Sequence, residues 1–257
     1  MVRSSVRHRI LGVIPARFAS TRFPGKLLTR FAGKTVLQHT YERAAKSQLI
    51  NDLIIATDDG RILREAQGFH AQTRMTRADH RSGTDRAAEV AASSDADIVV
   101  NIQGDEPLID PAAIDSATCC LIDDSGARMA TLKKRIEEPG EFTNPNVVKV
   151  VTDLQGNAVY FSRSPIPNDF GGGAAHYKHI GLYVYRRDFL LSYSSLPVGP
   201  LERAERLEQL RAIENGHRIR VVETNYESLG VDTPEDLERV ARIYEELIPQ
   251  TSRARNG

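Results

Sequence analysis

Short apolar runs alternate with helical patterns through the first half of the 257-residue chain. Three predominantly apolar runs have the length of a buried strand: Ile10–Ile14, Leu53–Ala56 and Ile98–Ile102. Apolar residues recur at helical spacing between these runs, in residues 36–45, 62–67 and 87–92. Strands that alternate with helices predict an α/β fold, in which helices cover both faces of a mostly parallel sheet.

The second half of the chain has a different pattern. Three short segments are rich in β-branched and aromatic residues and have no helical pattern between them: 146–152, 158–162 and 178–185. Such segments are typical of strands, so we expect a mixed sheet with a small inserted β-rich subdomain at about residues 130–200. The sequence has no repeat, low-complexity segment or linker, and we expect a single domain over residues 1–257.

Further elements are expected towards the end of the chain. Residues Leu201–Asn215 predict one long helix, which Gly216 ends because glycine suits a left-handed cap. Residues 218–222 predict a strand. Thr233 followed by Pro234 is typical of a helix start, since threonine caps the first amides and proline is tolerated in the first turn.

Composition and charge narrow the class of protein. The chain has 34 Lys and Arg residues and 34 Asp and Glu residues, whereas a general nucleic-acid binder carries a basic surplus. The longest apolar runs are too short to cross a bilayer, and residues 1–9 lack the apolar stretch of a signal peptide. We therefore expect a cytoplasmic protein with no nucleic-acid or membrane partner. Cys119 and Cys120 are adjacent, which fits a disulfide poorly, and we expect two reduced, buried thiols.

The loop after the first expected strand is rich in cations. Residues 15–26 contain Arg17, Arg22 and Lys26 together with small residues and two prolines. Ligands of open parallel sheets bind at the carboxyl ends of the strands, and exposed amides with Arg and Lys suit a nucleoside triphosphate. A solvated basic loop is the alternative interpretation. The loop has neither the Walker A pattern nor G-x-G-x-x-G.

Two acidic residues stand beside expected element ends. Asp105 follows the third strand, and Asp232 precedes the expected start of the last helix. Carboxylates in such positions can hold Mg²⁺, which prefers oxygen ligands. Spacing alone leaves other interpretations open, because Gly-Asp and Glu-Pro pairs form turns and an aspartate near a helix start interacts favourably with the helix dipole.

Four more segments carry polar side chains suited to a sugar or a nucleotide: residues 77–86, 160–167, 177–185 and 201–211. His179 and Tyr183 are four residues apart, so in a strand they point to the same face. Each candidate also has a structural interpretation, as a core residue, an ion pair or a solvated helix charge.

Taken together, these segments resemble one family. The cationic loop matches I-P-A-R followed by S-x-R-x-P-x-K. Later segments match S-G-T-[DE]-R, Q-G-D-E-P, Y-F-S-R, K-H-[IL]-G-[IL]-Y, L-E-Q-L-R and G-V-D-T-P-E-D-L, in the family's order and over about residues 10–245. The chain therefore resembles the CMP-Kdo synthetases, which are cytidylyltransferases that activate 3-deoxy-D-manno-octulosonate (Kdo).

This resemblance implies a fold and an activity. The fold is a Rossmann-like mixed sheet of the nucleotide-diphospho-sugar transferase type, with the inserted subdomain serving dimerisation. The activity is transfer of CMP from CTP to Kdo with release of pyrophosphate, for lipopolysaccharide biosynthesis. CTP and Kdo are the expected substrates, Mg²⁺ the expected cofactor and a homodimer the expected assembly. An anomeric hydroxyl would attack the α-phosphate, where cations stabilise the developing negative charge.

The resemblance also assigns roles to individual residues. The catalytic group would be Arg17, Lys26, Asp105 and Asp232, with the two aspartates as metal ligands. The nucleotide-binding residues would be Ala16, Arg17, Lys26, Ser82, Gly83, Arg86 and Gln103. The sugar-binding residues would be Gln103, Arg163, His179, Tyr183, Glu208 and Gln209. The role of Arg22 stays open.

Two stretches depart from the family pattern, namely residues 168–176 with the glycines Gly171–Gly173, and residues 225–229. Other functions predict partly different motifs. CMP-sialic acid synthetases have different blocks in place of the K-H-[IL]-G-[IL]-Y and L-E-Q-L-R segments, but a relative that uses an 8-amino variant of Kdo would differ at few pocket positions. A non-catalytic nucleotide-sugar sensor would lack a phosphate- or metal-binding residue. A glycosyltransferase with a D-x-D motif is disfavoured, because the acidic pair here is Asp105-Glu106.

Overall fold

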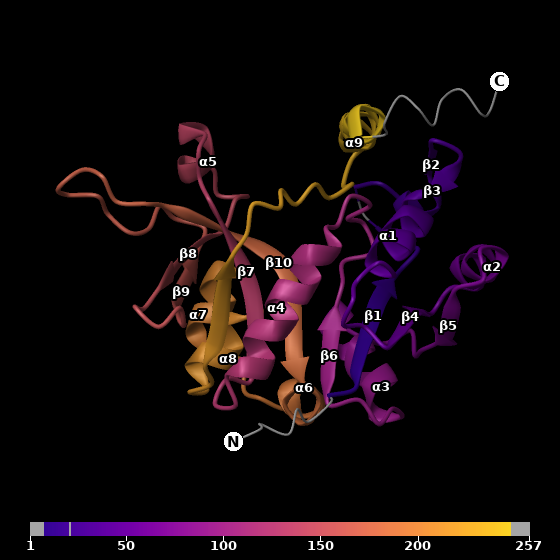
Figure 1. Ribbon diagram of the computed structural model, residues 1–257, viewed down its shortest axis with the longest axis horizontal. Coiled ribbons are helices and arrows are strands. Elements are labelled where there is room, and N and C mark those ends of the chain that lie inside the picture. The colour runs from indigo at the N-terminus through magenta and orange to yellow at the C-terminus, as the bar shows by residue number, and fades with distance from the viewer. Residues whose placement is uncertain (1–7, 21, 248–257) are drawn as a thin grey trace, which may run out of the picture.

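The computed structural model describes residues 8–20 and 22–247. Among these residues, nine strands form one sheet, and seven of them follow one another across it in the order β11-β7-β10-β6-β1-β4-β5 (Figure 1). Their bounds, in that order, are Ile219–Glu223, Met129–Arg135, Tyr177–Arg186, Ile98–Asn101, Ile10–Ala16, Asp52–Thr57 and Gln72–Met75. This arrangement confirms the expected mixed sheet.

Strand direction decides where the loops gather. Strand β1 is parallel to β4 and β6, β4 is parallel to β5, and β11 is parallel to β7. Strand β10 runs antiparallel to both β6 and β7. The carboxyl ends of β1 and β6, which are neighbours, therefore lie at the same edge of the sheet, and the segments that follow them meet there.

The expected β-rich segment attaches to the sheet through β10. Strand β8 (Lys149–Thr152) pairs with both β10 and β9 (Ala158–Ser162), and the short helix α5 (Pro139–Thr143) precedes this pair. The bounds of a separate inserted subdomain stay a prediction. Strands β2 (Arg30–Phe31) and β3 (Lys34–Thr35) form a small second sheet.

Helices cover both faces of the sheet, which explains the continuous apolar runs in the central strands. In β1, Ile10 and Ile14 pack into one hydrophobic cluster, while Leu11 and Val13 pack into the other. The first cluster includes side chains of α1 (Val36–Ala44), α2 (Gly60–Gly68), α4 (Pro111–Asp123) and α9 (Pro234–Leu247). The second includes side chains of α3 (Gly83–Ala92), α6 (Arg187–Tyr193) and α8 (Leu210–Glu214). Each fully buried isoleucine or leucine contributes about 1.5–3 kcal/mol.

The prediction of one long helix over Leu201–Asn215 was wrong. The segment forms α7 (Pro200–Glu205) and α8, separated by Arg206 in the left-handed conformation with φ 54° and ψ 47°. The Glu205 carboxylate accepts hydrogen bonds from the Ser162 hydroxyl (2.6 Å) and the Arg163 amide (2.9 Å). These contacts, with the last residue of β9 and the residue after it, fix the end of α7, and the local helical pattern of the sequence does not reveal them.

The expectation of two buried thiols was also wrong. Cys119 is exposed and Cys120 is partly exposed, and both are free. They lie on α4, whose inward face is formed by Ile114, Ala117 and Leu121. Cys119 falls outside that stripe, because residues three or four apart share a helix face and Cys119 is two residues from both Ala117 and Leu121. Cys120 is three residues from Ala117 and lies at the edge of the stripe, in agreement with its partial exposure. No helix in the described part of the chain has the length and apolar character needed to span a membrane.

The predicted helix end at Gly216 is confirmed. Gly216 has φ 77°, its amide donates to the Ile213 carbonyl (2.9 Å), and the His217 amide donates to the Ala212 carbonyl (2.9 Å). This is the paired hydrogen-bond pattern of a Schellman cap. The predicted start at Thr233 is confirmed as well, since its hydroxyl accepts a hydrogen bond from the Asp236 amide (3.2 Å).

Replacing Gly216 by alanine should lower the free energy of unfolding by about 1–2 kcal/mol, because a Cβ atom disfavours the left-handed conformation by that amount. Urea denaturation measures the loss. Gly68→Ala is the matched control, since Gly68 ends α2 without a left-handed φ and an added Cβ would meet nothing within 4 Å. Equal losses in the two variants would contradict this explanation.

Candidate active site

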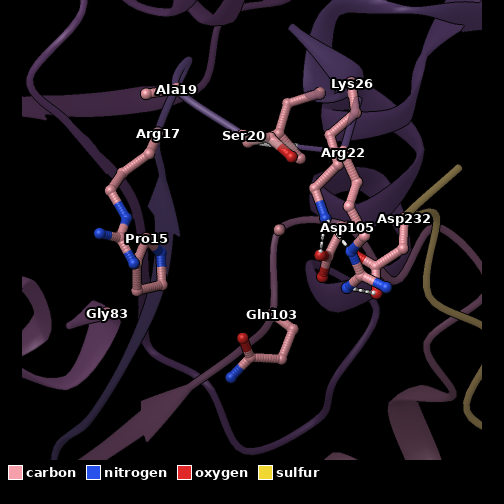
Figure 2. A pocket seen from close by; sticks show the side chains of 12 residues that line it. Pro15, Arg17, Ala19, Ser20, Arg22, Lys26, Gly83, Gln103, Asp105 and Asp232 are labelled. Carbon is pink, nitrogen blue, oxygen red and sulfur yellow. Dashed lines mark hydrogen bonds and ion pairs between the residues drawn. The ribbon is translucent and has the colours of Figure 1, made fainter. Parts of the chain in front are cut away.

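Two adjoining cavities open at the carboxyl edge of β1 and β6. The larger has a volume of about 490 Å³ and the smaller about 280 Å³. Gly83 and Gln103 line both, so the cavities share a wall. The remaining lining of the larger cavity is Pro15, Arg17, Ala19, Ser20, Arg22, Lys26, Leu27, Gly104, Asp105 and Asp232 (Figure 2). The cationic loop and both acidic residues predicted from the sequence therefore meet in one place.

Lys26 lies between the two aspartates. Its ammonium group donates to Asp105 and, at 2.8 Å, to Oδ1 of Asp232. The guanidinium of Arg22 donates to Oδ2 of the same aspartate, also at 2.8 Å. Asp105 and Asp232 are far apart in the sequence, yet their carboxylates contact one cationic nitrogen (Figure 2).

Local backbone geometry directs Lys26 into the cavity. Gly25 has φ 73° and its amide donates to the Phe18 carbonyl (3.1 Å), so the loop turns back on itself immediately before Lys26. Lys26 then begins the short 3-10 helix η1 (Lys26–Leu28), while Leu27 is buried in the core. The turn therefore places an apolar anchor next to the cation.

The charges in this cluster stabilise one another. Burial opposes the charge of Lys26, but attraction to Asp105 and Asp232 outweighs it and raises the pKa of the ammonium group. Burial also opposes the charge of Asp232, yet the hydrogen bond and charge of Lys26, with a contribution from Arg22, lower the pKa of that carboxyl group. Both partners are therefore ionised at neutral pH.

The opposite wall of the larger cavity carries groups suited to phosphate. Figure 2 shows Arg17 across the cavity from the Lys26 cluster. Arg17 is exposed and makes no ion pair with the described residues, so its guanidinium is available to an anion. Ser82 caps α3 by accepting a hydrogen bond from the Asp85 amide (3.2 Å), and Gly83 brings the first turn of that helix to the wall. Amides at a helix N-terminus attract anions.

Three predicted nucleotide residues are absent from the lining of both cavities: Ser82, which caps α3 beside the wall, Ala16 and Arg86. Ala16 ends β1 with a fully buried side chain, so only its backbone is near the site. Arg86 is fully buried and donates to Asp58 (2.9 Å) and to the Thr76 hydroxyl. These contacts join the segment after β4 to the segment after β5. Arg86 therefore supports the loops near the site, but its side chain does not line either cavity.

The smaller cavity contains three of the predicted sugar-binding residues besides Gln103. Tyr183, Glu208 and Gln209 line it, and the Tyr183 hydroxyl donates to Oε1 of Gln209 (3.3 Å). Burial raises the pKa of the Glu208 carboxyl group. The break between α7 and α8 turns Glu208 and Gln209 towards the sheet, so the feature that the helical pattern missed also builds the cavity.

The other two predicted sugar-binding residues stand outside the lining of both cavities. Arg163 donates from Nε to the Glu205 carbonyl (2.9 Å) and from Nη1 to the Pro145 carbonyl (3.0 Å). His179 packs against the ring of Tyr183 at 5.5 Å, as the predicted strand spacing requires. Its Nε2 lies 2.8 Å from the Thr131 hydroxyl, and burial lowers the pKa of the imidazole to about 3, so it is neutral.

Sequence reasoning missed Asn101, Thr84, Tyr185 and Arg206, which also line the smaller cavity. Asn101 is 1% exposed, and its Oδ1 has no hydrogen-bond partner among the described residues. Nε2 of Gln209 is buried without a partner in the same way. An acceptor and a donor left unpaired in one cavity suit a ligand hydroxyl, which can both donate and accept. A polar residue within an otherwise apolar strand was the available signal for Asn101.

Comparisons with known proteins point to one family. A family model described as cytidylyltransferase matches residues 11–219. The chain is 66% identical to 3-deoxy-manno-octulosonate cytidylyltransferase of Solibacter usitatus over 244 residues, which cover 94% of this chain and 97% of that protein. It is 56% identical to the enzyme of the same name from Geobacter metallireducens, with 90% of this chain and 96% of that protein covered.

Solved structures also include a similar synthetase, together with a more distant protein of the same fold. The structure of CMP:2-keto-3-deoxy-manno-octonic acid synthetase complexed with CTP is 43% identical, with a TM-score of 0.90 over 93% of this chain and all of that chain. The 4-diphosphocytidyl-2C-methyl-D-erythritol synthase of Anaerococcus prevotii is only 14% identical, with a TM-score of 0.63 over 93% of this chain and 99% of that one, and shares the fold alone. The chain belongs to the 3-deoxy-manno-octulosonate cytidylyltransferase family.

Proposed function

We propose that this protein transfers CMP from CTP to Kdo, giving CMP-Kdo and pyrophosphate. The observation that carries the proposal is the pair of adjoining cavities. One brings Lys26, Asp105 and Asp232 opposite the available guanidinium of Arg17, and the other offers unpaired polar atoms suited to a polyhydroxylated substrate. The shared wall at Gly83 and Gln103 would let a triphosphate and a sugar meet.

The donor set of the larger cavity fits Mg²⁺. Asp105 and Asp232 both contact the ammonium nitrogen of Lys26, so one cation can touch both carboxylates. The described residues contain no group of three or more His, Cys, Asp or Glu side chains arranged to hold a metal. Mg²⁺ is commonly held by one or two carboxylates with substrate phosphates and water completing its shell. When bound, it would polarise the phosphate oxygens and acidify a bound hydroxyl.

The chain's own residues would bind and orient the reactants. Arg17 and Lys26 would hold the triphosphate, because the planar guanidinium matches phosphate oxygens and the ammonium acts as a point charge. The anomeric hydroxyl of Kdo would attack the α-phosphorus as the bond to the leaving pyrophosphate breaks. Negative charge develops on the phosphate oxygens, and the fixed cations of the cavity stabilise it.

The wider setting is also part of the proposal. CMP-Kdo would serve lipopolysaccharide biosynthesis in the cytoplasm. The protein would act as a homodimer through the β8–β9 region and the loop that follows it, which expose Leu154, Val159 and Phe170. Gly171–Gly173 adjoin Phe170, so the stretch that departs from the family pattern belongs to this surface.

Incubation of the protein with CTP, Mg²⁺ and Kdo should release pyrophosphate in a Kdo-dependent manner, measured with a coupled pyrophosphate assay. ATP, GTP and UTP in place of CTP, and sialic acid or 8-amino-Kdo in place of Kdo, define both specificities. No Kdo-dependent release would contradict the proposed function, and faster turnover of 8-amino-Kdo would reassign the sugar.

Asp105→Asn should lower kcat by about 100-fold or more, because the change removes one of the two carboxylates that would hold Mg²⁺, the cation that would stabilise negative charge on the phosphate oxygens. The thermal unfolding midpoint should change little, since the side chain is not part of the hydrophobic core. Asp123→Asn, at an exposed position on α4, is the matched control and should keep full activity. Wild-type turnover in Asp105→Asn would refute the metal assignment.

Asn101→Ala should raise the KM for Kdo about tenfold while leaving the KM for CTP within about twofold. Loss of one hydrogen bond to a ligand costs roughly 1.5 kcal/mol, and 1.4 kcal/mol is a factor of ten. Asn157→Ala is the control, because Oδ1 of Asn157 is also buried without a partner but lies outside both cavities. Unchanged KM for Kdo in Asn101→Ala would exclude this residue from the sugar site.

A further inference from the structure

We propose that Glu106 is a positioning residue, which holds Asp232 opposite Asp105 by anchoring residues 224–232. We call residues 224–232 the strap. The inference rests on the proposed magnesium site, and it concerns how two carboxylates from distant parts of the chain reach the separation that one cation requires.

The strap has no secondary structure of its own. It joins the end of β11 to the start of α9 without helix or strand geometry. Figure 1 shows it crossing the edge of the sheet from β11 on one side of the molecule to α9 on the other. The Thr224 amide still donates to the Lys133 carbonyl of β7 (2.9 Å), but no β-ladder fixes the register of the strap beyond it, so individual hydrogen bonds decide where Asp232 lies.

Glu106 supplies two of these bonds. Its Oε2 accepts a hydrogen bond from the Tyr226 hydroxyl at 2.8 Å, and its Oε1 accepts one from the Ser228 hydroxyl at 2.7 Å. Glu106 is 6% exposed and Tyr226 is 8% exposed, so water competes little for these bonds. Both carboxylate oxygens are used, which matches a glutamate and leaves a glutamine one acceptor short.

The same turn carries Asp105, which therefore cannot move independently of the strap. The backbone carbonyl of Asp105 accepts a hydrogen bond from the Val231 amide at 2.9 Å, one residue before Asp232. The Asp232 amide then donates to Oδ2 of Asp236 at 3.1 Å, inside the first turn of α9. Asp232 is thus fixed on one side by the Asp105–Glu106 turn and on the other by its helix.

The opposite side of the strap offers a matched control. Glu227 points away from Glu106 and pairs with Lys134 on β7 and with Lys178 on β10, each at 2.6 Å. These ion pairs hold the strap to the sheet but have no contact with the turn that carries Asp105. Loss of the Glu227 charge therefore perturbs the strap without removing the link between the two aspartates.

The test compares CTP binding in Mn²⁺ with CTP binding in EDTA by isothermal titration calorimetry, without sugar. In Glu106→Gln, the Kd for CTP should rise about tenfold in Mn²⁺, as for loss of a residue that orients a metal ligand, and less than about twofold in EDTA. Tyr226→Phe combined with Ser228→Ala removes the same two bonds while keeping the carboxylate, and should give the same result. Glu227→Gln should change neither Kd by more than about twofold.

Thermal unfolding identifies variants that fail to fold, and the Tyr226→Phe/Ser228→Ala double variant carries the test if Glu106→Gln is one of them. A lower unfolding midpoint with an unchanged Kd in Mn²⁺ would overturn the proposal, because the contact would then be structural only. An equal effect of Glu227→Gln would overturn it too, since the whole strap rather than Glu106 would set the site. If the wild-type protein had the same Kd for CTP in Mn²⁺ and in EDTA, both the proposed magnesium site and this inference would be contradicted. Metal-dependent CTP binding without Kdo-dependent turnover would contradict the sugar assignment alone.

Discussion

The ammonium group of Lys26, held between Asp105 and Asp232, is the interaction on which the rest of the site depends. Two carboxylates close enough to share a hydrogen-bond donor repel each other, and unit charges about 4 Å apart interact by about 4 kcal/mol at an effective dielectric constant of 20. A repulsion of that size is a large part of the stability of an ordinary domain. A cation between them is therefore a requirement of this geometry, whether lysine or a metal ion supplies it.

The fold produces this geometry through strand order. Strands β1 and β6 are parallel neighbours, so the loop with Lys26 and the turn with Asp105 leave the sheet at the same edge. The reversed strand β10 then pairs Tyr183 with Asn101 across the β6–β10 ladder. This pairing places the smaller cavity directly beside the larger one. The two cavities are consequences of one sheet, rather than of two domains that close on each other.

Much of this arrangement could be predicted from the sequence, because its signals are local. Apolar runs marked the central strands, and the polar residues directly after them marked Lys26 and Asp105. Features that depend on partners distant in the sequence could not be predicted. The break after Glu205 depends on contacts with Ser162 and Arg163, and a helical pattern contains no trace of them.

The positions of individual polar side chains were harder to predict for the same reason. Arg86 was expected at the nucleotide by resemblance to the family's S-G-T-[DE]-R block, yet it lies on the face of α3 that also buries Ala87 and Val90. Helical spacing carried that information, because Arg86 and Val90 are four residues apart and residues three or four apart share a helix face. Asn101 was overlooked because the other residues of its strand are apolar, so the strand was interpreted only as part of the core. In both cases the side of the element, rather than the residue type, decides whether a polar group meets a ligand or a structural partner.

The choice of lysine at position 26 follows from the number of bonds that the site demands. An ammonium group has three N–H donors, and Asp105 and Asp232 take two of them. The third remains for a phosphate oxygen in the same cavity. A guanidinium would present its donors in a fixed plane, whereas the donors of an ammonium point in three directions from one atom. Lys26 can therefore neutralise two carboxylates and still bind an anion, which joins the acidic and the basic halves of the cavity through a single nitrogen.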